Sequence, residues 1–170
     1  IQTGSDGCDG IGDAAWSPSA ASAALHLRAA VNRLFREFFY SRNVLEVETP
    51  VLSSAGNTDP NIESFQLQFV GPKTAGVGQR WLRTSPEFPL KRLVAARIGD
   101  CYELGRVFRN GEAGRRHNPE FTMLEWYRPG FDHHELMDEM EQLLRHCGVE
   151  STVAFERISY RDAFLRHVRF

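Results

Sequence analysis

Apolar residues follow a helical spacing in one long segment near the N-terminus. Within residues 22–41 they recur every three or four positions, which is the spacing of one face of an α-helix. The positions concerned are Leu27, Val31, Leu34, Phe35 and Phe38. The pattern predicts an amphipathic helix, and the strand-like residues 44–47 that follow it end before Pro50.

The next part of the chain has the shorter period of β-strands. Alternating apolar residues predict a strand over residues 65–69, followed by a loop over residues 71–78. A short strand at residues 81–83 then leads into a helix over residues 86–98, which Gly99 ends.

Residues 102–108 and 121–127 are rich in apolar and aromatic types and predict two strands, and the Gly-, Asn- and Pro-rich residues between them predict a hairpin loop. Side chains alternate between the two faces of a strand. One face should therefore carry Phe121, Met123, Glu125 and Tyr127, and the other Thr122, Leu124, Trp126 and Arg128. From Phe121 to Glu125 the strand rises about 13 Å, which suits an adenine at one end and an amino-acid side chain at the other.

The last third of the chain is helical. Asp132 and Glu135 have the spacing of a capping box at the start of a helix. The apolar positions expected to face the core from this helix are Leu136, Met140, Leu143 and Leu144. A final helix is predicted over residues 160–167. Helices and antiparallel strands that segregate in this way indicate the α+β class.

The hairpin loop concentrates basic side chains, namely Arg109, Arg115, Arg116 and His117. A guanidinium stays charged and donates two parallel hydrogen bonds, so arginine suits phosphate oxygens. The ordinary alternative for basic residues in a polar loop is a solvated surface. Glu125 has the alternative of a cross-strand ion pair, and Phe121 and Tyr127 that of ordinary sheet packing.

Ser85, Pro86 and Glu87 have the pattern of a helix N-cap and first turn. An acid in that turn is favoured by the helix dipole without any ligand. The residue types alone therefore favour a capping role for Ser85 and Glu87.

Residues 108–127 resemble motif 2 of the class II aminoacyl-tRNA synthetases. The run Arg-His-Asn-Pro-Glu-Phe-Thr-Met-Leu-Glu is similar to that of lysyl-tRNA synthetases. Its continuation Trp-Tyr-Arg-Pro most resembles the truncated paralogues that attach (R)-β-lysine to elongation factor P. Residues 38–50 resemble motif 1, the dimer-forming helix, strand and proline, which implies that Pro50 lies at a dimer interface. The resemblance runs from about Leu25 to the C-terminus and implies a class II synthetase-like antiparallel sheet flanked by helices.

The resemblance implies a role for each matching residue. Arg109, as the catalytic residue, would bind the α-phosphate of ATP and the substrate carboxylate. The other ATP-binding residues would be Arg116 and His117 at the outer phosphates and Phe121, stacked on the adenine. Glu125 and Tyr127 would receive the far ammonium of lysine or (R)-β-lysine, and Glu87 the other amine, beside Ser85, which stands where lysyl-tRNA synthetases usually have alanine. The capping role of residues 85 and 87 is compatible with this, since a helix terminus fixes a carboxylate well.

The implied activity is ATP- and Mg²⁺-dependent formation of an aminoacyl adenylate, followed by transfer to a lysine side chain of elongation factor P. Two alternatives stay open: a lysyl-tRNA synthetase that charges tRNA, and a non-catalytic protein that binds ATP and an amino acid. One departure bears on the choice, because the acid that the family has two residues after Arg109 is replaced by Gly111, with Glu112 following it. We hypothesise that Glu112 takes over the role of this acid in ATP binding through a shifted loop.

The composition is that of a globular protein without a broad basic surface. The 170 residues carry a formal net charge of −2 with acids and bases interspersed, which fits a protein acceptor better than a nucleic acid. Three widely spaced cysteines argue against a disulfide framework or a zinc site and suit the cytoplasm. No leader-like start and no run near the roughly 20 apolar residues that span a bilayer is present, so neither export nor membrane insertion is expected.

The resemblance also predicts the domain organisation. We expect residues 1–19 to be a flexible segment and residues 20–170 to be the N-terminal part of a catalytic domain that contains motifs 1 and 2. Nothing after Leu136 resembles motif 3, which carries the second ATP-binding arginine of the family, so the chain as given is expected to be catalytically incomplete.

Overall fold

The computed structural model describes residues 18–168, apart from residues 73, 75, 77 and 150–154. Over these residues the chain forms helices and two three-stranded sheets, which confirms the α+β class. The segment 1–19 that the sequence predicts to be flexible lies, except for Pro18 and Ser19, outside the described residues.

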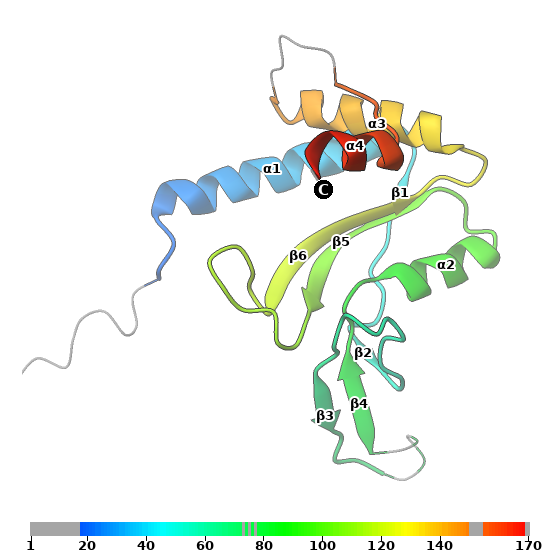
Figure 1. The fold of residues 1–170 in the computed structure, drawn as a ribbon. Helices are drawn as coiled ribbons and strands as arrows, with labels where there is room; N and C mark the ends of the chain where they lie inside the picture. The colour runs from blue at the N-terminus through cyan, green and yellow to red at the C-terminus, as the bar shows by residue number, and fades with distance from the viewer. Residues whose placement is uncertain (1–17, 73, 75, 77, 150–154, 169–170) are drawn as a thin grey trace, which may run out of the picture.

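Figure 1 shows how these elements are arranged. The helices are α1 (Ser22–Tyr40), α2 (Glu87–Ala95), α3 (His133–His146) and α4 (Tyr160–His167). The strands are β1 (Leu45–Glu46), β2 (Leu52–Ser53), β3 (Gln66–Gln68), β4 (Gln79–Leu82), β5 (Cys101–Phe108) and β6 (Glu120–Tyr127). The bounds agree with the sequence predictions to within a few residues, except that β2 was not predicted.

The larger sheet has the strand order β1-β5-β6, and β5 and β6 form the predicted hairpin. They pair antiparallel along their whole length, from Cys101 opposite Tyr127 to Phe108 opposite Glu120. β1 pairs with β5 in parallel, so this sheet is mixed, although the sequence predicted an antiparallel one. The parallel pair forms because a long crossover that contains the second sheet and α2 separates β1 from β5. The second sheet, β2-β4-β3, is antiparallel.

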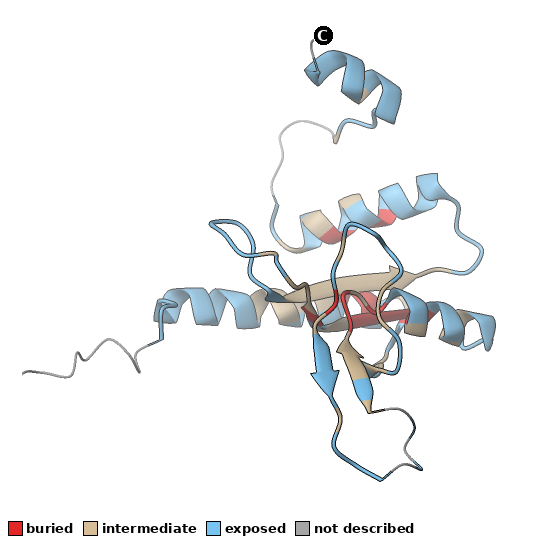
Figure 2. Cartoon of the chain, turned by 60° about the horizontal axis from the view of Figure 1, so that its bottom comes forward, coloured by how far each residue is buried: buried red, intermediate tan, exposed pale blue. Residues whose placement is uncertain are grey.

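The hydrophobic core lies on one face of the β5–β6 hairpin, beneath α1 and α3, whereas α2 covers the other face (Figure 1). Phe39 is completely buried and stacks on Tyr102 with ring centroids 4.4 Å apart. Leu27, which the helical pattern assigned to the apolar face, is 66 % exposed. The hydrophobic pattern predicts which face of the helix is apolar, but not how much of that face packs against the sheet. The N-terminal half of α1 extends past the edge of the sheet (Figures 1 and 2).

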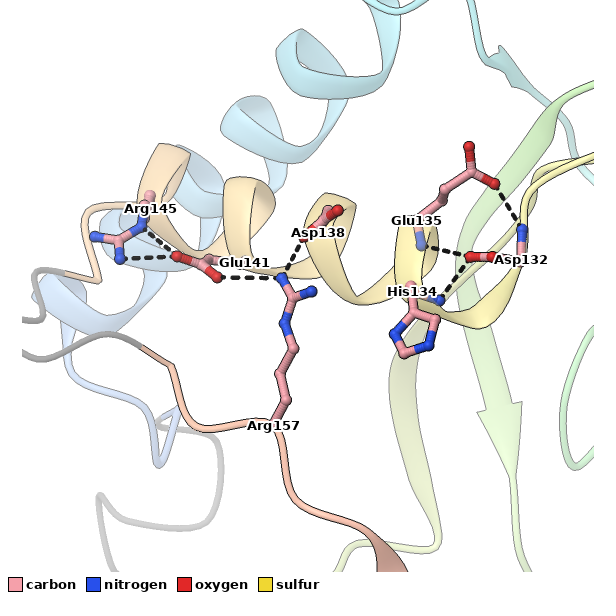
Figure 3. A network of polar contacts seen from close by, with 7 residues as sticks. All are labelled: Asp132, His134, Glu135, Asp138, Glu141, Arg145 and Arg157. Carbon is pink, nitrogen blue, oxygen red and sulfur yellow. Dashed lines mark hydrogen bonds and ion pairs between the residues drawn. The ribbon is translucent and has the colours of Figure 1, made fainter.

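Helix α3 begins with the predicted capping box, which Figure 3 shows from close by. The Asp132 carboxylate accepts hydrogen bonds from the amides of His134 and Glu135 at 2.8 and 2.9 Å. The Glu135 carboxylate accepts one from the Asp132 amide at 2.8 Å. Further along α3, Arg157 binds Asp138 and Glu141, which fastens the segment before α4 to this helix (Figure 3).

The prediction that four apolar residues of α3 face the core is only partly right. Leu143 is 3 % exposed, but Leu136 and Met140 are 36 % and 42 % exposed. They line an open groove of about 730 Å³ between α3, β6 and the segment 155–158. Strand β6 is the edge of its sheet, so within the described chain no further strand covers these side chains.

Two other properties bear on the predictions. The described cysteines, Cys101 and Cys147, are both free thiols. None of the helices in the described part of the chain combines the length and the apolar character that crossing a bilayer requires.

Candidate functional site

The face of the β5–β6 hairpin that turns away from the core carries the chemistry. Leu124 and Trp126 of β6 pack against the core, so the alternate residues Phe121, Glu125 and Tyr127 lie on the opposite face. A groove of about 910 Å³ opens over this face, between the loop after β2 and the start of α2. The polar and charged side chains that line it include Arg83, Ser85, Glu87, Arg109 and Glu125. The structure therefore brings residues from three separate segments of the sequence to one groove.

Acidic groups gather at one end of the groove, around Glu125, and the phenol of Tyr127 lies near them on the same strand, where it lines the groove along α3. Burial raises the pKa of the Glu125 carboxyl, and the nearby Glu87 and Glu103 raise it further, whereas a hydrogen bond from Ser85 and the charge of Arg83 act in the opposite direction. Burial and the same carboxylates, Glu125 and Glu87, raise the pKa of Tyr127 to about 12. A negative site that is partly removed from water favours the binding of a cation.

Ser85 and Glu87 have local roles as well as a place in the groove. The Ser85 hydroxyl accepts a hydrogen bond from the amide of Glu87 at 2.9 Å, at the first residue of α2. The Glu87 carboxylate lies in the first turn of the helix and forms an ion pair with Lys91 one turn later. The Ser85 hydroxyl therefore binds the first amide of α2 as predicted, although the N-cap position is Pro86, one residue later than the sequence predicted. The ion pair of Glu87 is compatible with ligand binding because an exposed pair of this kind contributes only about 0.3–0.5 kcal/mol.

Arg109 lies further along the same groove. Its Nε donates to the Thr84 carbonyl at 3.4 Å, and its guanidinium lies 5.3 Å from the centre of the Phe121 ring. Its Nη1 is 3.7 Å from the Glu112 carboxylate. Gly111 between them has φ +79°, a left-handed conformation that favours glycine. This turn brings the carboxylate of residue 112, rather than one of residue 111, to the arginine.

Arg116 and His117 are not brought to this groove. Both are exposed at the tip of the β5–β6 loop, where a narrow turn joins Gly114 and His117 through a hydrogen bond of 2.9 Å between the Gly114 amide and the His117 carbonyl. Within the described residues, neither side chain makes a hydrogen bond or an ion pair. The solvated alternative from the sequence therefore describes their state in this structure.

Pro50 is exposed and lies on the rim of the same groove, next to the segment that leads to β2. Its predicted place in a dimer interface stays a prediction. In the described part of the chain, no three His, Cys, Asp or Glu side chains come together as a metal site.

A buried polar network beneath the groove was not predicted from the sequence. Arg83 and Glu103 form an ion pair with Nη2 and Oε1 2.6 Å apart, and their side chains are only 5 % and 4 % exposed. Thr49 bridges the two, since its hydroxyl accepts from Arg83 at 2.8 Å and donates to Glu103 at 2.6 Å. The signal in the sequence was an acid at position 103, between apolar residues of a predicted strand, where a charge requires a partner.

Comparisons with known proteins identify the family of the chain. The family model of the class II tRNA synthetases (D, K and N) matches residues 15–168. Curated relatives named elongation factor P–(R)-beta-lysine ligase include a protein of Yersinia enterocolitica, 54 % identical over 155 residues, which are 91 % of this chain and 47 % of that protein. The relatives from Vibrio cholerae and Pseudoalteromonas translucida are 54 % and 52 % identical, over 88 % of this chain and 46 % and 45 % of their own lengths. The chain spans about half the length of these relatives. With the match of the family model over nearly its whole length, the chain belongs to the class II tRNA synthetase family of the D, K and N type.

Proposed function

We propose that the complete protein uses ATP to activate lysine or (R)-β-lysine as an aminoacyl adenylate and transfers the aminoacyl group to a lysine side chain of elongation factor P. The names of the relatives support the acceptor and the amino acid. The observation that carries the proposal is the groove, which places an arginine beside an aromatic ring and, on the same sheet face, a half-buried acidic pocket.

The acidic pocket supports a substrate with a cationic end. The Glu87 carboxylate raises the pKa of Glu125, and an ammonium group placed between the two carboxylates relieves this repulsion. The Tyr127 hydroxyl, which stays protonated at neutral pH, can donate to a carboxylate while the ammonium is bound. In this proposal Glu125 and Tyr127 bind the far ammonium, and Glu87 releases Lys91 to bind the other amine beside Ser85.

Arg109 supports the activation step. Its guanidinium can bind the α-phosphate and the substrate carboxylate together, because it presents several donors in one plane. A carboxylate oxygen of the amino acid attacks the α-phosphorus, a P–O bond forms, and the bond to the β-phosphate oxygen breaks to release pyrophosphate. The arginine acts by positioning the reactants and by stabilising the charge that develops on the phosphate oxygens.

The second step returns AMP. The uncharged amine of the acceptor lysine attacks the carbonyl carbon of the mixed anhydride, an amide bond forms, AMP leaves, and the amine loses a proton. Magnesium would neutralise part of the phosphate charge when it is bound. Because the described residues form no metal cluster of their own, it would reach the groove with the ATP phosphates.

The remaining ATP contacts extend along the hairpin. Phe121 would stack on the adenine, and Glu112 would occupy the place of the missing acid, held there by Arg109 at 3.7 Å. Arg116 and His117 would reach the outer phosphates only after the loop tip closes over the nucleotide. A cytoplasmic location and a homodimer with Pro50 in its interface complete the proposal.

Amino-acid-dependent exchange of pyrophosphate into ATP tests the proposal. The complete protein should catalyse exchange with lysine or (R)-β-lysine and should then label elongation factor P but not tRNA. Charging of tRNA would favour a lysyl-tRNA synthetase. Binding of ATP without any exchange would favour a non-catalytic protein and would refute the proposed reaction.

A further inference from the structure

The buried ion pair of Arg83 and Glu103 beneath the groove makes its further hydrogen bonds with Thr49 and Arg106. Arg83 donates from Nε to the Arg106 carbonyl at 3.0 Å and from Nη1 to the Thr49 carbonyl at 3.1 Å, in addition to its contact with Glu103. The second oxygen of Glu103 accepts from the amide and the hydroxyl of Thr49 at 3.2 and 2.6 Å. The partners of the Arg83 guanidinium therefore all lie outside the acidic pocket, which is formed by Glu87, Glu125 and Tyr127.

This pair is a direct neighbour of Glu125. Glu103 lies opposite Glu125 in the β5–β6 register, and opposite residues of an antiparallel pair have Cβ atoms only about 4.5–5.5 Å apart. The charge of a guanidinium that binds Glu103 therefore also acts on the neighbouring Glu125 carboxyl. Within the described residues, Glu125 nevertheless has no ion-pair partner.

Gly105 makes room for this arrangement. A Cβ atom at position 105 would collide with Nη2 of Arg83 and would lie 2.8 Å from the Glu103 carboxylate. The glycine has an ordinary backbone conformation, since it is absent from the residues with positive φ among those described. Glycine therefore suits position 105 because the absence of a Cβ atom leaves space for the ion pair.

We propose that Glu103 is a positioning residue, which holds the Arg83 guanidinium away from Glu125 so that the Glu125 carboxylate stays available to a cationic substrate. Without the charge of Glu103, Arg83 turns to the nearest carboxylate and occupies the pocket as an internal cation. The inference rests on the proposed function only in identifying the external cation as the ammonium group of a lysine.

The test uses Glu103→Gln in the complete protein, with two measurements. Carbon-13 NMR follows the titration of the Glu125 carboxyl, and calorimetry measures the binding of L-lysine and, separately, of ATP. We expect the pKa of Glu125 to fall below the ordinary value for glutamate, because Arg83 now pairs with it. Lysine affinity should fall by about tenfold or more, as expected when a charged partner is lost, while ATP affinity stays unchanged.

Three variants separate positioning from a general loss of structure. Arg83→Met combined with Glu103→Gln removes the competing cation and should restore lysine affinity, whereas a merely structural role predicts a further loss. Glu120→Gln is the matched control, since Glu120 is half exposed and pairs with Arg106 at the far end of β6. Gly105→Ala displaces the pair without removing a charge and serves if Glu103→Gln fails to fold, with the same fall in the pKa of Glu125 expected.

The outcomes are distinct. A pKa of Glu125 that stays raised in Glu103→Gln, or that returns only to the ordinary value with equal losses of lysine and ATP binding, would overturn the positioning role. Absence of lysine binding to the unmodified protein would instead contradict the proposed function. In that case the titration of Glu125 still decides whether Glu103 restrains Arg83.

Discussion

Glu139 should be the most costly acid to remove from helix α3. Its carboxylate is 5 % exposed and accepts a hydrogen bond from the Trp126 indole at 3.0 Å. It also lies 3.6 Å from Nε of Arg128, a side chain that is only 10 % exposed. Two nitrogens of this arginine, Nε and Nη1, are buried and lack a hydrogen-bond partner among the described residues. Glu139 therefore supplies much of the compensation for a buried positive charge.

The size of the effect follows from what each substitution leaves behind. Glu139→Ala leaves Arg128 with Asp100, 3.4 Å from its Nη1, as the remaining counter-charge, and breaking a buried pair in this way costs about 3–5 kcal/mol. Glu139→Gln can keep the bond to Trp126 but loses the charge, for about 1.5–3 kcal/mol. Both are large fractions of a typical stability of about 5–15 kcal/mol.

Helix α3 also supplies the control. Glu141 lies two residues further on, is 27 % exposed and pairs with Arg145 and Arg157 near the surface. Glu141→Gln should therefore cost less than about 1 kcal/mol. Urea unfolding of the matched variants measures the differences. Equal losses for Glu139→Gln and Glu141→Gln would show that the buried network contributes no more than a surface pair, and would refute the reasoning.

The remaining predictions concern the groove. In the folded protein the pKa of Glu125 is raised by burial and by Glu87, so its ionisation lowers stability as pH rises through that pKa; Glu125→Gln should raise the melting temperature at about pH 7 but hardly at about pH 4, and should abolish lysine binding. Gly111→Ala should cost about 1–2 kcal/mol because of φ +79°, whereas Gly114→Ala, without a positive φ, should cost less, as thermal unfolding will show. Glu112→Gln should slow ATP-dependent adenylate formation by the complete protein, and an unchanged rate would contradict its role beside Arg109. Light scattering on the complete protein should give the mass of a dimer, which a monomer at micromolar concentration would exclude.

Much of the fold could be predicted because local patterns decide it. The capping box at Asp132 and Glu135 and the two arms of the hairpin depend on residues that are close in sequence. Periodicity could not predict which apolar positions find a partner. Leu27 and Met140 have helical spacing but are exposed, because their burial depends on how far the sheet extends and on which strand forms its edge.

The site was predictable where alternation along one strand decides it, and not where distant segments meet. Period two along β6 separates Glu125 from Leu124 and Trp126 without any knowledge of the rest of the chain. The network of Thr49, Arg83 and Glu103 joins three segments whose proximity follows only from the crossover that places β1 beside β5. The positions of Arg116 and His117 could not be predicted either, because a polar loop tip without packing contacts has no local pattern that fixes its side chains.

The two faces of β6 have different roles, since one packs against the core and stabilises the fold and the other carries the charge of the site. Trp126 on one face binds Glu139 of α3, so this face is fixed by the core and by a buried polar network. Glu125 on the other face is partly desolvated beside other acids, an arrangement that lowers the stability of the unliganded protein. A strand can carry a carboxylate whose ionisation is unfavourable only if the residues on its other face are well packed, because neighbouring residues share one backbone. We therefore expect Glu139 variants to weaken lysine binding in proportion to their loss of stability, and Glu125 variants to weaken it while stability increases.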